Sequence, residues 1–195
     1  MKSIYNHLVD WNNSNSDFIF LNHNKNYTIS EVLYEVDSIA KPLDYIEDNF
    51  IGIHINSSID TIFLYLACIK TNKTPILFHT SWSKKQLDYL INKYKIKHII
   101  SEWKSKEIFD QGVTMYYLEE LINSSRGCGV PIESGSNRNP ECILFTSGST
   151  GFPKAVPLEA NNFYHSNIGW NQEIEFNNSD VYTLCLPISH ISGLS

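Results

Sequence analysis

The chain has 195 residues, of which 42% are hydrophobic and 18% are charged, and its formal net charge is −6. This ordinary globular composition is long enough for one good core or two small ones. The acidic balance argues against a nonspecific nucleic-acid-binding protein, which would present a basic face. The longest apolar helix-like run, residues 62–69, is far too short to span a bilayer.

The first part of the chain alternates strand patterns with helix patterns. Predicted strands cover residues 17–22, 25–28, 50–55, 75–79, 98–101 and 113–118. Predicted helices cover residues 1–10 and follow Thr28, Ser58 and Ser83, of which Thr28 and Ser83 begin capping boxes. Strands that alternate with helices indicate βαβ units. The predicted fold class is therefore α/β, with parallel-sheet βαβ units flanked by helices.

Residues 123–140 interrupt this alternation. They are rich in Ser, Gly, Asn and Pro, which is typical of a linker. We therefore predict a first α/β subdomain at residues 1–122, a linker at 123–140 and the start of a second α/β subdomain at 141–195. In the second part we expect strands from Cys142, at 155–158 and at 181–186, and a helix at 159–174. The strand from Cys142 is expected to start a second sheet.

Cysteine and histidine usage gives no sign of a disulfide framework or a metal site. The four cysteines form no C-x-x-C pair, and Cys68, Cys142 and Cys185 lie inside apolar runs, as small buried hydrophobic residues do. This pattern predicts a reduced, cytoplasmic protein. Six histidines lack the spacing of metal ligands and are interpreted as structural or exposed: His7, His23, His54, His79, His98 and His165.

Residues 143–156 carry the strongest chemical signal. An apolar strand ends abruptly in a loop of hydroxylated residues and glycines, and Lys154 follows. Gly148 and Gly151 permit positive φ and let the backbone approach a ligand closely. Loop N–H groups, hydroxyl groups and a lysine ammonium can then converge on an anion. The candidate polyphosphate-binding residues are Thr146, Ser147, Gly148, Ser149, Thr150, Gly151 and Lys154.

Three familiar motifs do not fit this loop. A Walker A loop needs a lysine directly after its last glycine, whereas Lys154 stands three positions after Gly151. A Rossmann fingerprint needs a third glycine. A nucleophile elbow needs a glycine where Ser147 stands. The plain structural alternative is a serine- and glycine-rich surface turn between two strands.

The loop resembles the phosphate loop of the adenylate-forming, or AMP-binding, superfamily. Residues 145–154 match its signature, aromatic-Thr-Ser-Gly-Ser/Thr-Thr-Gly-x-Pro-Lys-Gly, at every fixed position, and only Ala155 departs by replacing the final glycine. Pro187, His190 and Gly193 match a second family motif, Pro-x-x-His-x-x-Gly. A lone histidine after a strand is more often a core residue. Because His190 occurs together with the phosphate-loop motif, we interpret it as a site residue.

The resemblance continues upstream in a weaker form. Residues 27–32 are similar to an early family box, and residues 50–90 to a second one, in which Lys70, Thr71 and Asn72 replace the usual Lys-Ala-Gly. Within the superfamily, residues 154–157 and 186–195 look most like the o-succinylbenzoate–CoA ligases of menaquinone synthesis.

The resemblance implies an ATP-dependent acid–CoA ligase that adenylates a carboxylate and then forms a thioester with coenzyme A. Lys154 and His190 would be the catalytic residues, and ATP, Mg²⁺ and coenzyme A the cofactors and co-substrates. The expected partners are a small carboxylic acid, ATP and coenzyme A, with no nucleic acid and no membrane span. The family's adenine, ribose, Mg²⁺ and catalytic-lysine segments follow the second motif. We therefore expect an incomplete N-terminal domain of an adenylate-forming enzyme, inactive by itself.

Two other functions are considered. A non-catalytic nucleotide- or partner-binding remnant of the same fold predicts that surfaces covered by the rest of the family domain are polar or paired here. A P-loop NTPase is disfavoured by the spacing of Lys154.

Overall fold

The computed structural model describes residues 2–15, 17–103, 109, 112–124, 140–146, 151–177 and 180–194. Its helices are α1 (Ile4–Asn15), α2 (Ile29–Asp44), α3 (Ile59–Lys70), α4 (Lys84–Tyr94), α5 (Leu118–Ser124), α6 (Ala160–Glu173) and α7 (Ile191–Leu194). Its strands are β1 (Ile19–Asn22), β2 (Asn26–Thr28), β3 (Phe50–His54), β4 (Thr74–Leu77), β5 (His98–Ser101), β6 (Thr114–Tyr117), β7 (Cys142–Thr146) and β8 (Lys154–Leu158). Among these residues, no helix is both long enough and apolar enough to cross a membrane.

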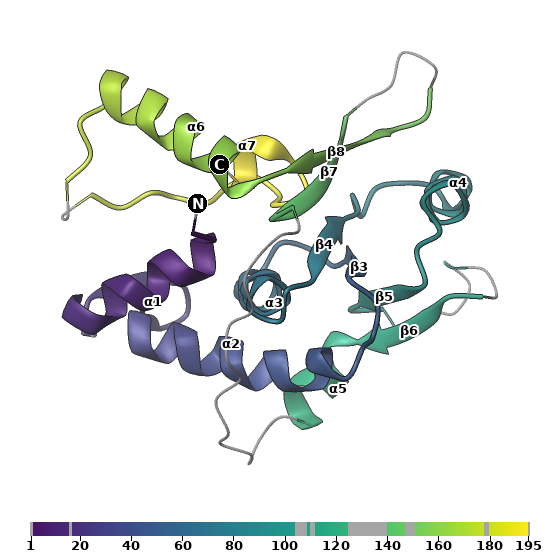
Figure 1. The fold of residues 1–195 in the computed structure, drawn as a ribbon, viewed down its shortest axis with the longest axis horizontal. Helices are drawn as coiled ribbons and strands as arrows, with labels where there is room; N and C mark the ends of the chain where they lie inside the picture. Colours follow the sequence, from purple (N-terminus) through teal and green to yellow (C-terminus); the bar gives the residue numbers. More distant parts are fainter. Residues whose placement is uncertain are drawn as a thin grey trace.

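A mostly parallel sheet forms the centre of the molecule. Within the described residues it has six strands, in the order β6-β5-β3-β4-β7-β8. Every neighbouring pair is parallel except β7 and β8, which form an antiparallel hairpin. Helix α3 connects β3 to β4, and α4 connects β4 to β5 (Figure 1). The predicted α/β class with parallel βαβ units is confirmed.

The helices begin where the capping boxes predict. Glu31 donates its backbone N–H to the Thr28 hydroxyl at 3.2 Å, and its carboxylate accepts the Thr28 backbone N–H at 2.8 Å. Ser83 and Gln86 make the same reciprocal pair at the start of α4. These bonds satisfy N–H groups that have no partner inside a helix. Both helices then direct apolar residues at helical spacing toward the sheet.

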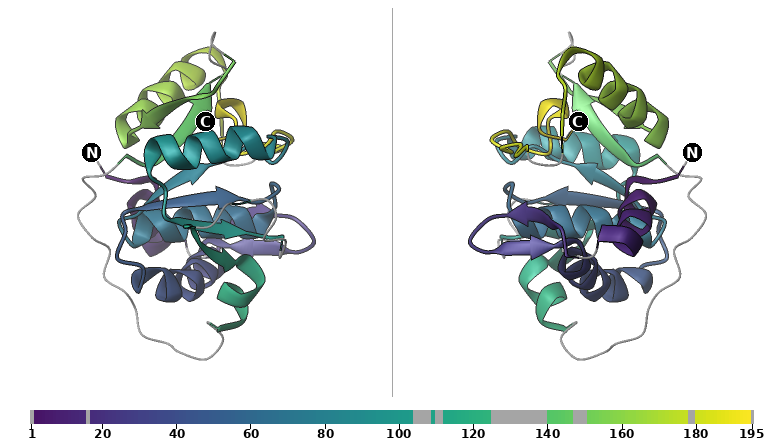
Figure 2. Two further views of the ribbon diagram at one scale, coloured as in Figure 1. Left: turned by 90° about the vertical axis from the view of Figure 1, so that its right-hand side faces the viewer. Right: turned by 90° about the vertical axis from the view of Figure 1, so that its left-hand side faces the viewer.

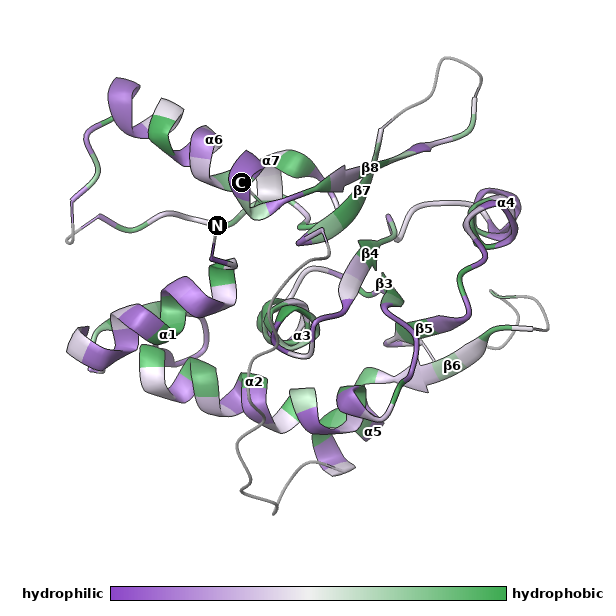
Figure 3. Ribbon diagram, viewed as in Figure 1, coloured by the Kyte–Doolittle hydropathy of each residue, from purple (hydrophilic) through white to green (hydrophobic). Residues whose placement is uncertain are grey.

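Two hydrophobic cores lie on opposite faces of the sheet. One packs α1, α2, α3 and α5 against the strands, and the other packs α4 against β4 and β5. Helix α3 is buried on several sides, including Phe63, Leu64 and Leu66. Figure 3 shows its apolar colouring next to the central strands, whereas the outer helices have mixed faces. The sheet is thus the middle of three layers, and α4 stands on the face opposite α3 (Figure 1).

The prediction that the strand from Cys142 starts a second sheet is wrong. Strand β7 pairs in parallel with β4, with Ile143 opposite Ile76, so the hairpin extends the first sheet. Without β7, the backbone groups of β4 would be left as an open edge, and pairing satisfies them. Thr74 reinforces the junction because its hydroxyl donates to the Pro140 carbonyl at 3.0 Å. The division into two subdomains stays a prediction.

Residues 181–186 do not form the predicted strand. They have no pairing partner in the described part of the chain, and Val181 is 84% exposed. An apolar alternating sequence becomes a strand only where a neighbouring backbone completes its hydrogen bonds. Cys185, expected to be buried, is consequently exposed, whereas Cys68 and Cys142 are buried as predicted. Helix α5 was not predicted and takes the first two residues of the expected linker; residues 125–139 lie outside the described part.

Candidate functional site

The β7–β8 hairpin carries the predicted phosphate loop. Its register places Thr146 directly opposite Lys154, the last and first residues of the two strands. Gly151 has φ +82°, a conformation that L-residues rarely adopt, so the predicted use of glycine is confirmed at this position. Four predicted ligands, Ser147, Gly148, Ser149 and Thr150, lie outside the described residues. The register of the hairpin therefore fixes Thr146 and Lys154, the paired strand residues nearest the loop.

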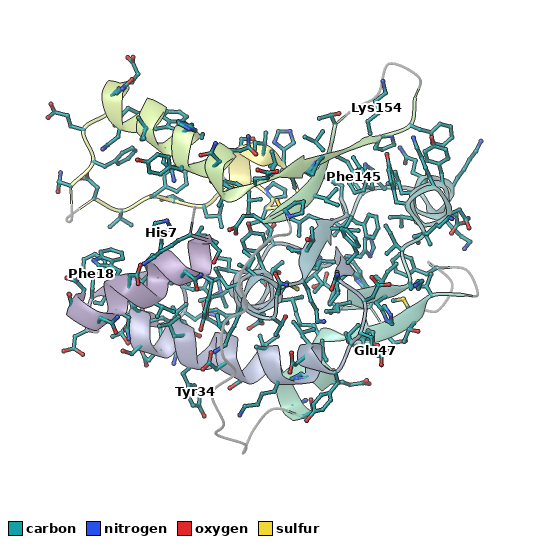
Figure 4. The ribbon with its side chains drawn as sticks, viewed as in Figure 1. His7, Phe18, Tyr34, Glu47, Phe145 and Lys154 are labelled. Carbon is teal, nitrogen blue, oxygen red and sulfur yellow. The ribbon has the colours of Figure 1, made fainter. Side chains whose placement is uncertain are left out.

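One face of the hairpin forms a wall of a cavity. Leu144 and Thr146 of β7, and Val156 and Leu158 of β8, line it. Residues two apart project to the same side of a strand, so Lys154 belongs to this face as well. Its side chain is exposed and does not line the cavity itself. Figure 4 shows Lys154 farther out along the hairpin than Phe145.

The second motif forms a tight turn against the first part of the chain. Ile188 is buried, and its backbone N–H donates to the Ser57 hydroxyl at 3.0 Å, directly before α3. The His190 N–H donates to the Pro187 carbonyl at 3.0 Å. A side chain at Gly193 would place its Cβ 2.3 Å from the Pro187 carbonyl oxygen, so only glycine fits. The turn thereby fixes the position of His190.

His190 lines the cavity, and its role as a site residue stays a prediction. Its Nδ1 lies 2.6 Å from the Ser192 hydroxyl, which orients the ring. Among the described residues, Nε2 has no hydrogen-bond partner and is free to meet a ligand. The Ser192 backbone N–H donates to the same Nδ1 at 3.4 Å, and since an N–H can only donate, this contact favours the neutral tautomer that carries its proton on Nε2.

The carboxyl end of β4 supplies a wall that the sequence analysis missed. His79, Trp82 and Gln86 line the cavity, although His79 was interpreted as structural or exposed. The His79 Nδ1 lies 2.9 Å from the Ser81 hydroxyl. These residues directly follow a parallel strand that neighbours β7, and ligands of α/β sheets bind outside the carboxyl ends of strands. The missing signal was the adjacency of β4 and β7, which the sequence does not state.

The cavity has a volume of about 630 Å³, typical of a small-molecule site. Its described lining combines aromatic rings, aliphatic side chains and a few polar groups: His79, Trp82, Gln86, Leu144, Phe145, Thr146, Gly151, Pro153, Val156, Leu158, Ser189, His190 and Ile191. None of these residues is acidic. The cavity can therefore hold an uncharged or anionic molecule with a flat apolar part, but this lining supplies no carboxylate for a divalent cation.

Comparisons with known proteins agree with the motifs. The family model described as AMP-binding enzyme matches residues 8–195. A 2-succinylbenzoate–CoA ligase of Staphylococcus epidermidis is 29% identical over 172 residues, covering 86% of this chain and 35% of the relative. The ligase of the same name from Staphylococcus aureus is 28% identical over 196 residues, covering 88% of this chain and 40% of the relative.

Solved structures share the fold. The o-succinylbenzoate CoA synthetase (MenE) of Bacillus subtilis, in complex with the acyl-adenylate intermediate OSB-AMP, superposes with a TM-score of 0.87 at 19% identity, covering 99% of this chain and 52% of that one. The N-terminal subdomain of Klebsiella oxytoca NpsA gives a TM-score of 0.69 at 20% identity, covering 82% of this chain and 42% of that one. This chain thus spans roughly a third to a half of these relatives. Because the family model covers nearly all of its residues, the chain belongs to the AMP-binding enzyme family.

Proposed function

We propose that this chain forms the phosphate- and acid-binding part of an ATP-dependent acid–CoA ligase, with 2-succinylbenzoate as the acid. One observation carries the proposal. The fold brings Thr146 and Gly151 of the first motif and His190 of the second to one cavity, although the motifs are far apart in sequence. The names of the similar ligases support the choice of acid.

The proposed reaction has two steps. A carboxylate oxygen attacks the α-phosphorus of ATP, the bond to the bridging oxygen breaks, and acyl-AMP and pyrophosphate form. The sulfur of coenzyme A then attacks the acyl carbon, and AMP leaves. A carboxylate is already a nucleophile, so no activating dyad is needed, and positioning with charge stabilisation carries the rate.

In this scheme, the hairpin loop stabilises the negative charge that develops on the departing pyrophosphate. Lys154 stands at the loop's end on the cavity face, exposed and free to reach a phosphate. The remaining loop donors proposed for the phosphates are Thr146, Ser147, Gly148, Ser149, Thr150 and Gly151. Each preorganised donor of this kind contributes on the order of 3 kcal/mol to a transition state.

The aromatic lining suits an acid that carries a ring. Phe145 stacks on Phe78 with ring centroids 5.8 Å apart, and Trp82 meets Phe145 edge-on at 5.2 Å. This cluster is continuous with the wall formed by His79. Flat apolar walls with few polar groups favour an aromatic substrate, and we place His190 where it would contact the acid near the reacting carboxylate.

Mg²⁺ and coenzyme A belong to the proposed activity. The described lining offers no carboxylate to Mg²⁺, so we assign neither a metal ligand nor a metal-dependent step to it. The proposed location is the cytoplasm, consistent with the buried thiols of Cys68 and Cys142, whose pKa values burial raises to about 12.

The non-catalytic alternative receives less support. It predicts that the surfaces which the rest of the family domain would cover are polar or paired in this chain. Instead, helix α6 buries none of its residues, and Trp170 and Phe176 are half exposed. Exposed apolar surface of this extent is typical of a face that another part of a protein covers.

Lys154→Ala in the complete gene product tests the proposal. We expect the adenylation step to slow by about tenfold to a hundredfold, since one charged hydrogen bond contributes roughly 1.5–3 kcal/mol. The thioester step should change little, because pyrophosphate has already left. Single-turnover kinetics from ATP and acid, compared with kinetics from preformed acyl-AMP and coenzyme A, separate the two steps. Lys85→Ala, at another exposed lysine, is the matched control. Equal losses in both steps, or none, would contradict the role.

A further inference from the structure

Helix α4 contacts both ends of the hairpin loop through aromatic side chains. The Tyr94 ring lies 6.0 Å from that of Phe145, the residue before Thr146. The Tyr89 ring lies 4.2 Å from that of Phe152, the residue after Gly151. Tyr89 and Tyr94 thus reach opposite ends of the loop from a single helix.

Tyr94 adds a hydrogen bond to the ring contact. Its hydroxyl accepts the backbone N–H of Ala155 at 3.2 Å. Among the described strands, β8 stands at the edge of the sheet, and the Ala155 N–H bonds to the tyrosine hydroxyl from α4. Ala155 is also the one signature position at which this chain departs from the family pattern. The Tyr94 hydroxyl therefore holds the edge of β8 one residue beyond Lys154.

Helix α4 is a rigid support for these contacts. Its start is fixed by the Ser83 capping box, and its inner face buries Leu87, Leu90 and Ile91 against the sheet. Lys93 links the two tyrosines: its ammonium donates to the Tyr89 hydroxyl at 3.0 Å and lies 5.3 Å from the centre of the Tyr94 ring. The rings of Tyr89 and Tyr94 are thus held in place by the buried face of α4 and by Lys93 between them.

We propose that Tyr94 and Tyr89 are positioning residues that set the separation of the two loop ends, and so the geometry in which the loop meets a polyphosphate. The inference rests on the proposed function of the loop as a phosphate site. Preorganised donors must be held within about 0.5 Å of their working geometry, and the hairpin register alone fixes only the strand side of the loop. Helix α4 supplies the second support, from a different βαβ unit.

The first test measures the Tyr94–Ala155 hydrogen bond, here called the brace, without any ligand. Tyr94→Phe keeps the ring on Phe145 but removes the acceptor for Ala155. We expect amide exchange of Ala155, followed by NMR, to become about fivefold faster, as for the loss of one neutral hydrogen bond. Tyr45→Phe, at a tyrosine that is 90% exposed, is the matched control and should leave this amide unchanged. An unchanged Ala155 amide in Tyr94→Phe overturns the brace.

The second test measures binding of inorganic pyrophosphate by calorimetry. Tyr89→Leu removes the ring from Phe152 and should weaken binding by about three- to tenfold, whereas Tyr89→Phe, which retains the ring, should bind nearly as the parent does. Urea unfolding of the same variants separates positioning from stability. If the parent chain binds pyrophosphate and Tyr89→Leu binds equally well, the positioning role is wrong. If the parent binds none, the proposed function of the loop fails, while the Ala155 amide still decides whether the brace exists.

Discussion

The two ends of this chain use similar sequence patterns with opposite results. Helix α2 begins with a reciprocal capping box, and α6 begins with half of one, in which the Glu159 N–H donates to the Asn162 side chain at 2.8 Å. Yet α2 buries six residues and α6 buries none. Figure 2 shows α6 in light green at one end of the molecule, beyond the hairpin, whereas α2 lies toward the opposite end and packs with α3 in the main core. A capping box therefore fixes where a helix starts, and the tertiary partner decides whether the helix contributes to stability.

Strand pairing, hydrogen bonds and ring contacts connect the two regions. The second region, residues 140–194, joins the first through β4–β7 pairing and through a hydrogen bond and ring contacts from α4 to the hairpin. Three further hydrogen bonds join Thr74 to Pro140, Ile4 to Glu141 and Ile188 to Ser57. The cavity lies across this junction, with walls from both regions. Cys142 and Leu144 of β7 are also buried in the core formed with the first region. The geometry of the cavity therefore depends on the packing of β7 as well as on these bonds.

Matched isoleucine truncations should show the largest difference between the regions. Ile39 in α2 is 3% exposed and Ile168 in α6 is 39% exposed. Ile39→Ala should lower the free energy of unfolding by about 2–5 kcal/mol, because it removes buried methyl groups and leaves a cavity. Ile168→Ala should change it by less than about 0.5 kcal/mol. Urea unfolding followed by circular dichroism measures both, and similar losses would mean that α6 is packed after all.

A buried carboxyl group at the junction should make stability depend on pH. Glu141 is 1% exposed; its Oε1 accepts the Ile4 N–H at 3.3 Å, and its Oε2 has no partner among the described residues. Burial raises the pKa of Glu141 from 4.5 to about 7. The folded state therefore binds more protons than the unfolded state, and this contribution to stability is complete below pH 4.5 and lost as the pH rises through 7.

Glu141→Gln should remove this dependence. We expect the variant to be more stable than the parent at pH 8, by on the order of 3 kcal/mol, and similar at pH 4.5. His54 opposes the trend, because burial lowers its pKa from 6.5 to about 4, and its contribution is lost as the pH falls across that range. Removing the Glu141 slope should thus reveal a stability that rises between pH 4 and 6.5. Urea midpoints across pH, with exposed Glu47→Gln as control, measure this; an unchanged slope would contradict it.

The same contrast explains how much could be predicted from sequence. Local patterns placed the capping boxes at Thr28 and Ser83, the parallel strands and the glycine at 151. The pairing partner of a strand is not a local property of the sequence. Strand β7 of the hairpin pairs with β4, whereas residues 181–186 pair with no strand in the described part of the chain. Strand formation there depends on a second backbone, which periodicity cannot reveal.

The site divides along the same line. Thr146, Gly151 and His190, which their motifs proposed as site residues, all line the cavity, and their roles stay predictions. Trp82 and Gln86 were missed, because they reach the cavity only through the pairing of β4 with β7, which brings the residues after β4 beside the hairpin. Their local pattern is that of an ordinary helix start, and nothing in it distinguishes a cavity wall from a solvent face.

Two glycines within the second region should respond in opposite directions, and this is the smallest effect expected. A Cβ at Gly193 would lie 2.3 Å from the Pro187 carbonyl oxygen, whereas a Cβ at Gly169 in α6 meets nothing within 4 Å. Gly193→Ala should destabilise the His190 turn by about 1–3 kcal/mol, as overpacking does. Gly169→Ala should stabilise α6 by about 0.5–1 kcal/mol, because alanine is the better helix former. The exchange rate of the Gly193-position amide, which donates to the His190 carbonyl at 2.9 Å, reports the first change, and amides of α6 report the second. The contrary outcome is that both variants leave the amide exchange rates of their own segment unchanged while the exchange rates of the core amides of α2 change. The two regions would then unfold as one unit and would differ only in burial.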